Sequence, residues 1–168
     1  FNEGDKGGFK AAAIKMQMVL SLPDDSLKIT DNPILFTDTS PLEGLVISGV
    51  DNMEARHIIW ARVKKFRALV PLYVDGRIGV EWDDESSKVT GEWIEVFAVK
   101  PSSFEDCELY EEHLCSDEEA EPLRCTAQAV AYIGSLVAGF VGGTIRKFVT
   151  GELYHRHFLY DALTSQVL

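Results

Sequence analysis

The sequence predicts an α/β domain with a sheet covered by helices, from three observations. The 168 residues suit one domain, and 46% of them are hydrophobic, which is ample for a core. Short apolar runs with strand character alternate with longer segments whose apolar residues recur at helical spacing. The resulting order is helix, strand, strand, helix, strand, strand, helix, strand.

The first half of the chain contains two predicted helices and two predicted strands. Residues 8–21 have the composition of a helix, and residues 26–30 form a plausible strand. Residues 44–50, "GLVISGV", are apolar without alternation, as expected for a strand covered on both faces. Residues 53–66 carry apolar residues at helical spacing, so they predict the second helix.

Two further strands are predicted in the middle of the chain. They are residues 69–74 and the longer, alternating residues 91–99, and "DGRIG" (75–79) is expected to turn or bulge the chain between them. The acidic, serine-rich residues 83–88 predict a solvated hairpin tip. Residues 80–91 are interpreted as a local hairpin insertion, because their removal would join "DGRIG" to "EWIEVF".

The last part of the chain predicts a long helix at residues 126–149, closed by Gly151, and then one or two strands. Residues 125–145 have no charge and are long enough to span a bilayer. Their hydroxyl, amide and glycine content favours a buried helix over a membrane span. Small residues recur at every fourth position along two faces, which predicts burial in the core or at a subunit interface, and we expect a homodimer through this helix.

The charge balance limits the class of partner. The chain has 27 acidic and 16 basic residues, a formal net charge of −11. Phosphate contacts need basic patches, so this balance argues against nucleic-acid or anionic-membrane binding and favours a neutral or basic partner. Nine acidic residues fall between Glu105 and Glu121, within the segment 101–124. The run predicts an exposed loop with a short helix or, alternatively, a specific docking surface.

The three cysteines do not form a recognisable disulfide framework, because their number is odd and their spacing is wide. A reducing compartment is the simpler expectation, and we expect a cytoplasmic protein. Cys125 stands beside Arg124 at the start of the uncharged helix. It is either a thiol nucleophile activated by the helix N-terminus or a buried structural cysteine, and both interpretations stay open.

Asp51 and Asn52 follow an apolar strand and precede a helix, a common place for chemistry in α/β proteins. Asp51 suits a Mg²⁺ ion held by one or two carboxylates and phosphate oxygens. Alternatively, either residue caps the helix. Arg56, in the first turn of that helix, is an unfavourably placed cation, so it pairs with an acid or faces an anion. Lys10 has the same unfavourable position at the start of its helix and is either solvated or in contact with a phosphate.

Metal binding has weaker support in the sequence. His155 and His157 share one face of a probable strand, but two ligands do not make a site.

Three stretches in order resemble the ThiF/MoeB/HesA family, the fold shared with ubiquitin-activating enzymes. "FNEGDKGGFKAAA" resembles its F-x-x-x-D-x-G-x-x-K-A segment, and "SGVDNMEAR" resembles its D-x-x-D-N-x-x-x-R segment, with Ser48 where the first Asp often stands. "RCTAQAVAYIGSLVAGFVGGTIRKFVTGE" with "FLYDALTSQV" resembles its terminal cysteine-containing helix and following strand. The resemblance covers nearly the whole chain.

The resemblance implies a Rossmann-like mixed sheet and a mechanism. Family members bind ATP and Mg²⁺ and adenylate the C-terminal carboxylate of a ubiquitin-like or sulfur-carrier protein. Lys10 matches the lysine on the nucleotide phosphates, and Asp51 matches the aspartate that serves ATP and its metal, with Asn52 and Arg56 beside it. Cys125 matches a cysteine that accepts the activated carrier in some members. The segment 101–124 matches the crossover loop over the carrier's tail, where the acidic run would steer a basic tail.

Two family features are missing from the sequence. The glycine-rich nucleotide loop of the first βαβ portion would precede Phe1, so the chain matches only the later part of the fold and we expect it to carry part of the site. The paired CxxC motifs are also missing, so no structural zinc is expected. A non-catalytic interaction subunit that keeps the fold and its dimer-forming helix is the alternative function.

Overall fold

The computed structural model describes residues 10–21, 28–83, 85–86, 88–115 and 131–168. The chain divides into two compact units, Phe1–Phe36 and Thr37–Leu168. The first unit contains helix α1 (Lys10–Ser21), which confirms the predicted first helix over its described residues.

The strand predicted at residues 26–30 is wrong where the structure describes it, because residues 28–30 are not in a strand. The described part of the first unit offers no second strand with which this segment could pair. An ion pair between Lys15 and Asp31, 2.7 Å from Nζ to Oδ1, connects the residues after this segment to α1 instead.

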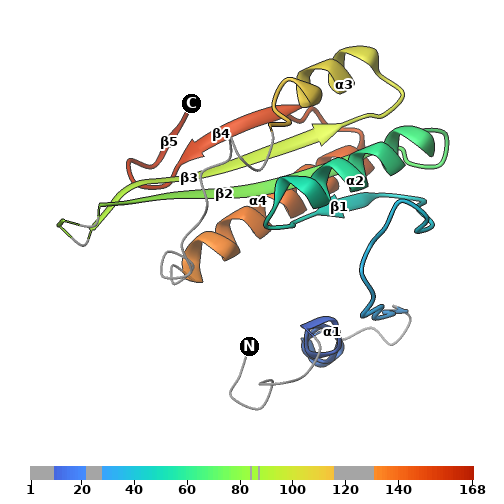
Figure 1. The fold of residues 1–168 in the computed structure, drawn as a ribbon, viewed down its shortest axis with the longest axis horizontal. Helices are drawn as coiled ribbons and strands as arrows, with labels where there is room; N and C mark the ends of the chain where they lie inside the picture. The colour runs from blue at the N-terminus through green and yellow to red at the C-terminus, as the bar shows by residue number, and fades with distance from the viewer. Residues whose placement is uncertain (1–9, 22–27, 84, 87, 116–130) are drawn as a thin grey trace. The chain divides into compact units, whose positions relative to one another are not determined.

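The second unit contains a mixed five-stranded sheet (Figure 1). Its strands, in spatial order, are β1 (Val46–Ser48), β2 (Tyr73–Asp83), β3 (Lys88–Val99), β4 (His157–Asp161) and β5 (Gln166–Val167). β1 is parallel to β2, whereas β2, β3, β4 and β5 pair antiparallel in sequence. The two short strands at the C-terminal end confirm the prediction of one or two strands there.

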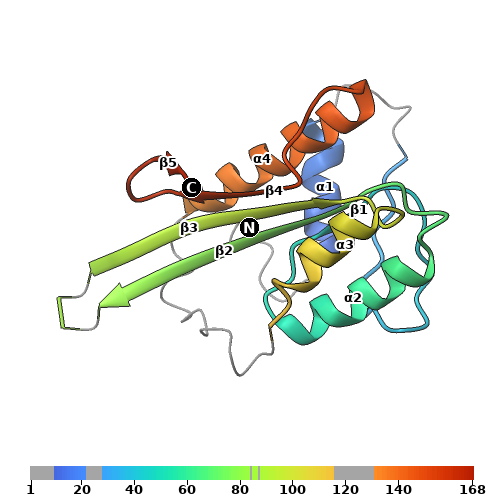
Figure 2. The same cartoon turned by 90° about the horizontal axis from the view of Figure 1, so that it is seen from above.

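Helices cover the two faces of this sheet. α2 (Met53–Lys65) and α3 (Phe104–Glu111) lie on one side, and α4 (Ala131–Thr150) lies on the other (Figures 1 and 2). The predicted α/β class with a mixed sheet covered by helices is therefore confirmed. The helix predicted at 53–66 is also confirmed, to within one residue.

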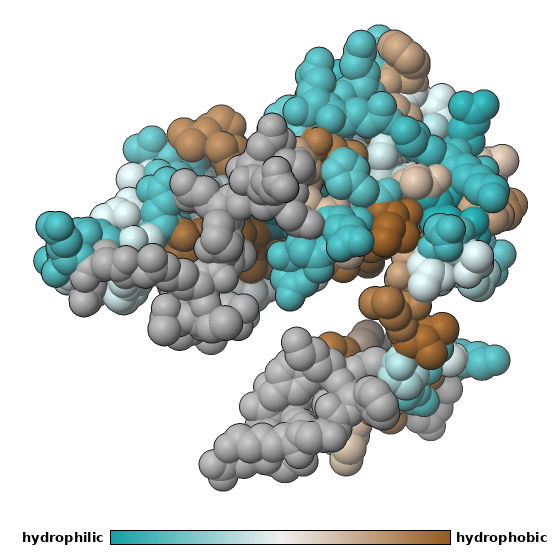
Figure 3. Space-filling model, in the orientation of Figure 1, coloured by the Kyte–Doolittle hydropathy of each residue, from teal (hydrophilic) through white to brown (hydrophobic). Residues whose placement is uncertain are grey.

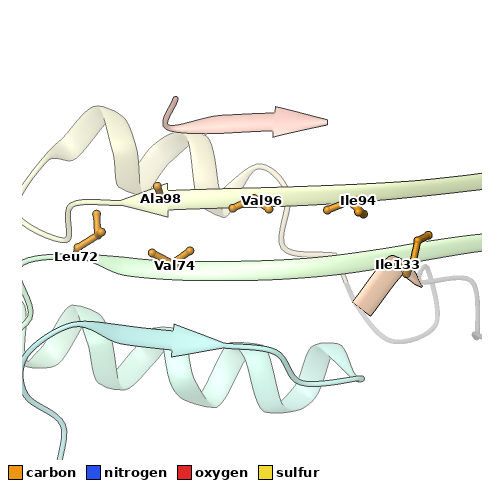
Figure 4. Close-up of a cluster of buried hydrophobic side chains, with 6 residues drawn as sticks. All are labelled: Leu72, Val74, Ile94, Val96, Ala98 and Ile133. Atoms are coloured by element: carbon orange, nitrogen blue, oxygen red, sulfur yellow. The ribbon is translucent and has the colours of Figure 1, made fainter. Parts of the chain in front are cut away.

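One apolar cluster of the core lies between α4 and the long β2–β3 hairpin, and other buried apolar residues, such as Ile59, Val63 and Val99, lie outside it. Side chains alternate between the faces of a strand, so every second residue of β2 and β3 points to α4. The buried cluster on this face consists of Leu72, Val74, Ile94, Val96, Ala98 and the α4 residue Ile133 (Figure 4). Full burial of such a side chain stabilises the fold by about 1.5–3 kcal/mol.

The turn predicted at "DGRIG" is wrong, because residues 75–79 lie inside β2. They pair without interruption from Asp75 opposite Phe97 to Gly79 opposite Trp93. The glycines here serve close packing. A Cβ at Gly76 would lie 3.0 Å from a methyl carbon of Val137, and one at Gly79 would overlap the Trp93 ring.

The strand predicted at residues 69–74 begins later than expected. Residues 66–69 form the turn that ends α2, and the backbone N–H groups of Leu69 and Val70 both donate to the carbonyl of Phe66. β2 then starts at Tyr73. Val70 and Leu72 are buried although they lie before the strand, and Leu69 is exposed, so hydrophobicity alone placed the strand start too early.

The hairpin tip predicted at residues 83–88 is confirmed over its described residues. The Asp83 carboxylate accepts hydrogen bonds from the backbone N–H of Glu85, at 3.0 Å, and the hydroxyl of Ser86, at 2.6 Å. Residues 80–91 form the outer end of the same ladder that pairs residues 75–79 with 93–97, with one irregularity between Glu81 and Trp82. Their status as an insertion stays a prediction.

Gly151 ends α4 as predicted, with a φ of +72°. Its N–H donates to the Phe148 carbonyl at 3.2 Å, and the Glu152 N–H donates to the Lys147 carbonyl at 2.8 Å. These two bonds satisfy the last carbonyl groups of the helix in a Schellman motif. Residues 126–130 of the predicted helix lie outside the described residues. Within the described ranges, no helix is long and apolar enough to cross a membrane.

The row of small residues on α4 faces away from the sheet. Gly134, Ser135, Ala138, Gly139 and Gly142 are all exposed in the chain. Burial in the core is therefore wrong for these residues. The alternative, a subunit interface, stays a prediction.

Candidate functional site

Asp51 lies just beyond the carboxyl end of β1, where the chain turns into α2. Its side chain is exposed, and its Oδ1 accepts a hydrogen bond from Nδ2 of Asn52 at 3.1 Å. The Oδ1 of Asn52 in turn accepts from the backbone N–H of Ala55 at 2.7 Å, which makes Asn52 the N-cap of α2. The capping interpretation is thus confirmed for Asn52, while the Asp51 carboxylate points to solvent beside the helix N-terminus.

Arg56 holds the β1–α2 loop from inside. It is buried, and its Nε donates to both Asp75 carboxylate oxygens, at 3.3 and 3.2 Å. Its Nη2 donates to the carbonyl of Val50 at 2.6 Å. Of the two interpretations of this cation, the acid pair is confirmed. Arg56 fixes the backbone immediately before Asp51, and a contact between Arg56 and a nucleotide stays a prediction.

Asp75 is the centre of a buried ionic network that sequence reasoning missed. Its side chain has 0% exposure, and it also accepts from Nε of Arg77 at 2.8 Å and from the hydroxyl of Tyr110 at 3.0 Å. Nη1 of Arg77 continues the network to Glu95, at 3.3 Å. The sequence contains one indication of this network: Asp75 and Arg77 are two residues apart, which places both charges on the same face of a strand. The interpretation of "DGRIG" as a turn concealed this indication.

Aromatic rings of α2, β2 and α3 enclose this network. Trp60 and Tyr110 lie 4.8 Å apart between ring centroids, and Tyr73 and Tyr110 lie 5.4 Å apart. The hydroxyls of Tyr73 and Tyr110 are 3.0 Å apart. Burial is the largest cause that raises the pKa of both phenols. Buried rings and ion pairs therefore support the loop that carries Asp51.

The arrangement around Asp51 is suited to a metal–phosphate ligand. Mg²⁺ favours one or two carboxylates together with phosphate oxygens, and one exposed carboxylate is available here. The nearby N-terminus of α2 also favours negative charge, because its first N–H groups point outward. The residues present therefore fit a divalent ion that arrives bound to a phosphate compound.

The remaining predicted site residues lie outside this cluster. Lys10 is the first residue of α1, in the other unit, and its side chain lies outside the described residues, as does Cys125. Their approach to Asp51 stays a prediction.

The acidic segment contains a short helix, as predicted, since α3 carries four of its acids: Glu105, Asp106, Glu108 and Glu111. Hydrophilic side chains cover the surface over α3 in Figure 3. Asp106 is not free for docking, because it is buried and accepts hydrogen bonds from the Lys100 N–H and from the Ser103 hydroxyl, both at 3.0 Å. Of the exposed acids of α3, Glu105 pairs with Arg156 at 3.2 Å and Glu111 with Lys64 at 2.8 Å. The docking-surface alternative therefore concerns exposed acids that are in part already paired.

A surface hollow of about 610 Å³ lies between the C-terminal part of α2 and α3. Its lining includes Lys64, Arg67, Cys107 and Glu111. It lies toward the opposite end of α2 from Asp51, and a helix of 13 residues is about 20 Å long. The chemistry predicted at Asp51 therefore does not belong to this hollow.

A scan against protein-family models and searches of curated proteins and of solved structures found no match to the chain. Function is therefore inferred from the motifs and the geometry alone.

Proposed function

We propose that the protein takes part in ATP-dependent adenylation of the C-terminal carboxylate of a ubiquitin-like or sulfur-carrier protein, on a Rossmann-like fold of the ThiF/MoeB/HesA type in the cytoplasm. One observation carries the proposal: the exposed carboxylate of Asp51 stands at the carboxyl end of β1, on a loop fixed by buried Arg56. This is the position at which open α/β sheets bind ligands.

The chemistry assigns a role to each predicted residue. Asp51 would hold Mg²⁺, and Lys10 would contact the phosphates of ATP. The carrier's carboxylate oxygen attacks the α-phosphorus, the bond from that phosphorus to the bridging oxygen breaks, and pyrophosphate leaves. Bound Mg²⁺ would supply positive charge beside the phosphate oxygens, and the ammonium group of Lys10 would add to it.

The partner surfaces follow from charge and shape. The exposed acids of α3 attract a basic carrier tail toward the site, because opposite charges steer association. Cys125 would accept the activated carrier, its thiolate forming a thioester with the carrier's carboxyl carbon while AMP leaves. Two copies of the chain meet through the exposed small residues of α4, which let helix backbones approach closely.

Those exposed small residues also support a second function, a non-catalytic interaction subunit. Such a subunit would keep the dimer face of α4 and have no use for the Asp51 carboxylate. A Gly139→Arg substitution would then convert a dimer to a monomer in light scattering, while Asp51→Asn would change nothing.

A calorimetric titration of the full-length protein with Mg·ATP tests the enzyme proposal. Asp51→Asn is expected to weaken binding by about tenfold or more, which is 1.4 kcal/mol or more. Asp38→Asn removes the same charge from an exposed turn in the same unit and is expected to leave binding unchanged. Lys10→Ala, with Lys28→Ala as its control, extends the test to the phosphate contact. Equal affinities for the Asp51→Asn and Asp38→Asn proteins would overturn the proposal.

A further inference from the structure

Three side chains with metal-ligating atoms meet near the C-terminal end of α3. They are Glu95 of β3, His113 just after α3, and His157 of β4, and their ligand atoms all lie within 4.8 Å of one another. The sequence suggested His155 as the neighbour of His157, but His155 is exposed, and the structure brings together two residues that are distant in the chain.

Each side chain of this cluster is already oriented. Nε2 of His157 lies 2.9 Å from Oε1 of Glu95, and its ring stacks on Phe97 with 4.3 Å between ring centroids. Nδ1 of His113 lies 2.8 Å from the carbonyl of Leu109, to which it donates, so its Nε2 keeps a lone pair for a ligand. A histidine that donates its other ring N–H to a backbone carbonyl is the common arrangement in metal sites.

We propose that Glu95, His113 and His157 bind one Zn²⁺ ion. Two imidazoles and one carboxylate are an established donor set for zinc, with water in the fourth position. Bonds of about 2.0–2.2 Å in a tetrahedron place the ligand atoms about 3.3–3.6 Å apart. The widest pair of ligand atoms, at up to 4.8 Å, would close by about 1.2–1.5 Å. Nε2 of His157 and Oε1 of Glu95, 2.9 Å apart, would separate by about 0.4–0.7 Å as the ion replaces the proton between them. The expectation of no structural zinc rested on the missing CxxC pairs, and this donor set contains no cysteine.

The charges around the cluster permit a bound cation. Arg77 contacts Oε2 of Glu95 at 3.3 Å, so the ion would take Oε1, in place of the hydrogen bond that this oxygen accepts from His157. The guanidinium of Arg77 is itself paired with the buried Asp75 carboxylate at 2.8 Å, so its charge is largely compensated. Its Nη1 also donates to the carbonyl of His113 at 2.9 Å. Arg77 therefore holds both the carboxylate and the histidine backbone in place.

The bound ion would join three separate elements. It would link the residue that follows α3 to neighbouring strands β3 and β4, and so fix the end of α3 against the sheet. Zinc is expected to raise the melting temperature of the protein, because an ion that binds only the folded state stabilises it by mass action.

The test uses the full-length protein, stripped with EDTA and then titrated with Zn²⁺. One equivalent is expected to bind, and His113→Ala and His157→Ala are each expected to weaken that binding by more than about 100-fold. His155→Ala, two residues from His157 on an exposed position, is the matched control and should bind as the wild type does. Melting curves in EDTA identify any variant that fails to fold. If an alanine variant fails, His113→Gln or His157→Gln replaces it.

Substitution with Co²⁺ distinguishes this site from a cysteine site. A tetrahedral nitrogen–oxygen site gives visible d–d absorption without a thiolate charge-transfer band, and this spectrum should disappear in both histidine variants. A thiolate band would overturn the proposal, as would zinc binding by the wild type that does not exceed binding by the histidine variants. Neither readout involves ATP, so the result is independent of the proposed adenylation.

Discussion

Arg56 of α2 and Asp75 of β2 form an ion pair inside the protein, 3.2 Å between Nε and Oδ2, and the Asp75 side chain has no exposed surface. The pair joins the helix that follows the candidate site to the strand beside β1. Because Arg56 also holds the carbonyl of Val50, the geometry of the loop before Asp51 depends on a carboxylate that is 24 residues further along the sequence. A buried contact thus determines where an exposed group stands.

Removing the Asp75 carboxylate should destabilise the protein strongly. Asp75→Ala leaves the guanidinium groups of Arg56 and Arg77 without their shared partner, and loss of one member of a buried pair costs about 3–5 kcal/mol. Urea unfolding measures the change, with Asp75→Asn as a milder variant. Asp51→Ala is the control, since an exposed substitution is expected to change the free energy of unfolding by about 0.5 kcal/mol or less. Similar losses for both alanine variants would contradict the buried network.

The two buried tyrosines should make stability fall at alkaline pH. Burial raises the pKa of Tyr73 and Tyr110 in the folded protein above the unfolded value of about 10. The two neutral phenols therefore contribute fully to the free energy of unfolding below pH 10, and this contribution is lost as the pH rises through their pKa values in the folded protein. Urea unfolding between pH 7 and about pH 11 should show this decline, and it should be smaller in Tyr110→Phe. Tyr154→Phe, as control, should decline like the wild type.

Substitution by alanine should lower the melting temperature by different amounts at two glycines of the hairpin. At Gly79 a Cβ would lie 1.9 Å from the Trp93 ring, whereas at Gly91 the nearest atom, at 2.6 Å, is a carboxylate oxygen at the flexible end of Glu81. Overpacking a rigid ring costs about 1–3 kcal/mol, so Gly79→Ala should lower the melting temperature. Gly91→Ala should change it much less, because Glu81 can move. A larger fall in melting temperature for Gly91→Ala than for Gly79→Ala would contradict this prediction.

The surface contacts of Glu111 should stabilise the folded protein only above acidic pH. Hydrogen bonds from Lys64 and then from Trp60 lower the pKa of the Glu111 carboxyl from its ordinary value. The stabilisation is therefore present above the unfolded value of about 4.3 and is lost as the pH falls through the lowered folded value. Glu111→Gln should cost at most about 1 kcal/mol at pH 7 and nothing near pH 2, with Glu112→Gln as the control. A difference that is independent of pH would contradict the ion pair.

The sequence predicted those parts of the fold that depend on local signals. Helical spacing and the cap residue Asn52 located α2, and Gly151 located the end of α4, because helix termini use chemistry that is visible in neighbouring residues. The position of Asp51 between a strand and a helix was predicted in the same way, and its role stays a prediction. These predictions needed no knowledge of distant contacts.

The features that the sequence did not reveal depend on contacts between distant segments. Gly76 and Gly79 resemble turn residues locally, but they pair with β3 in a strand, where α4 and the Trp93 ring occupy the space that a Cβ would fill. The Asp75 network and the Glu95–His113–His157 cluster each combine residues of different elements. Periodicity in one segment cannot indicate which charged residue of another segment will face it.

The opposite characters of the two faces of β2 also protect the hairpin from mispairing while it folds. Shifting β2 by one position relative to β3 would turn Asp75 and Arg77 toward the aliphatic side chains of α4 and bring Val74 into the ionic network. Burying two charges in hydrocarbon is so costly that such a misaligned hairpin could not complete its packing with α4. The ionic network therefore rejects wrong alignments in addition to stabilising the correct one.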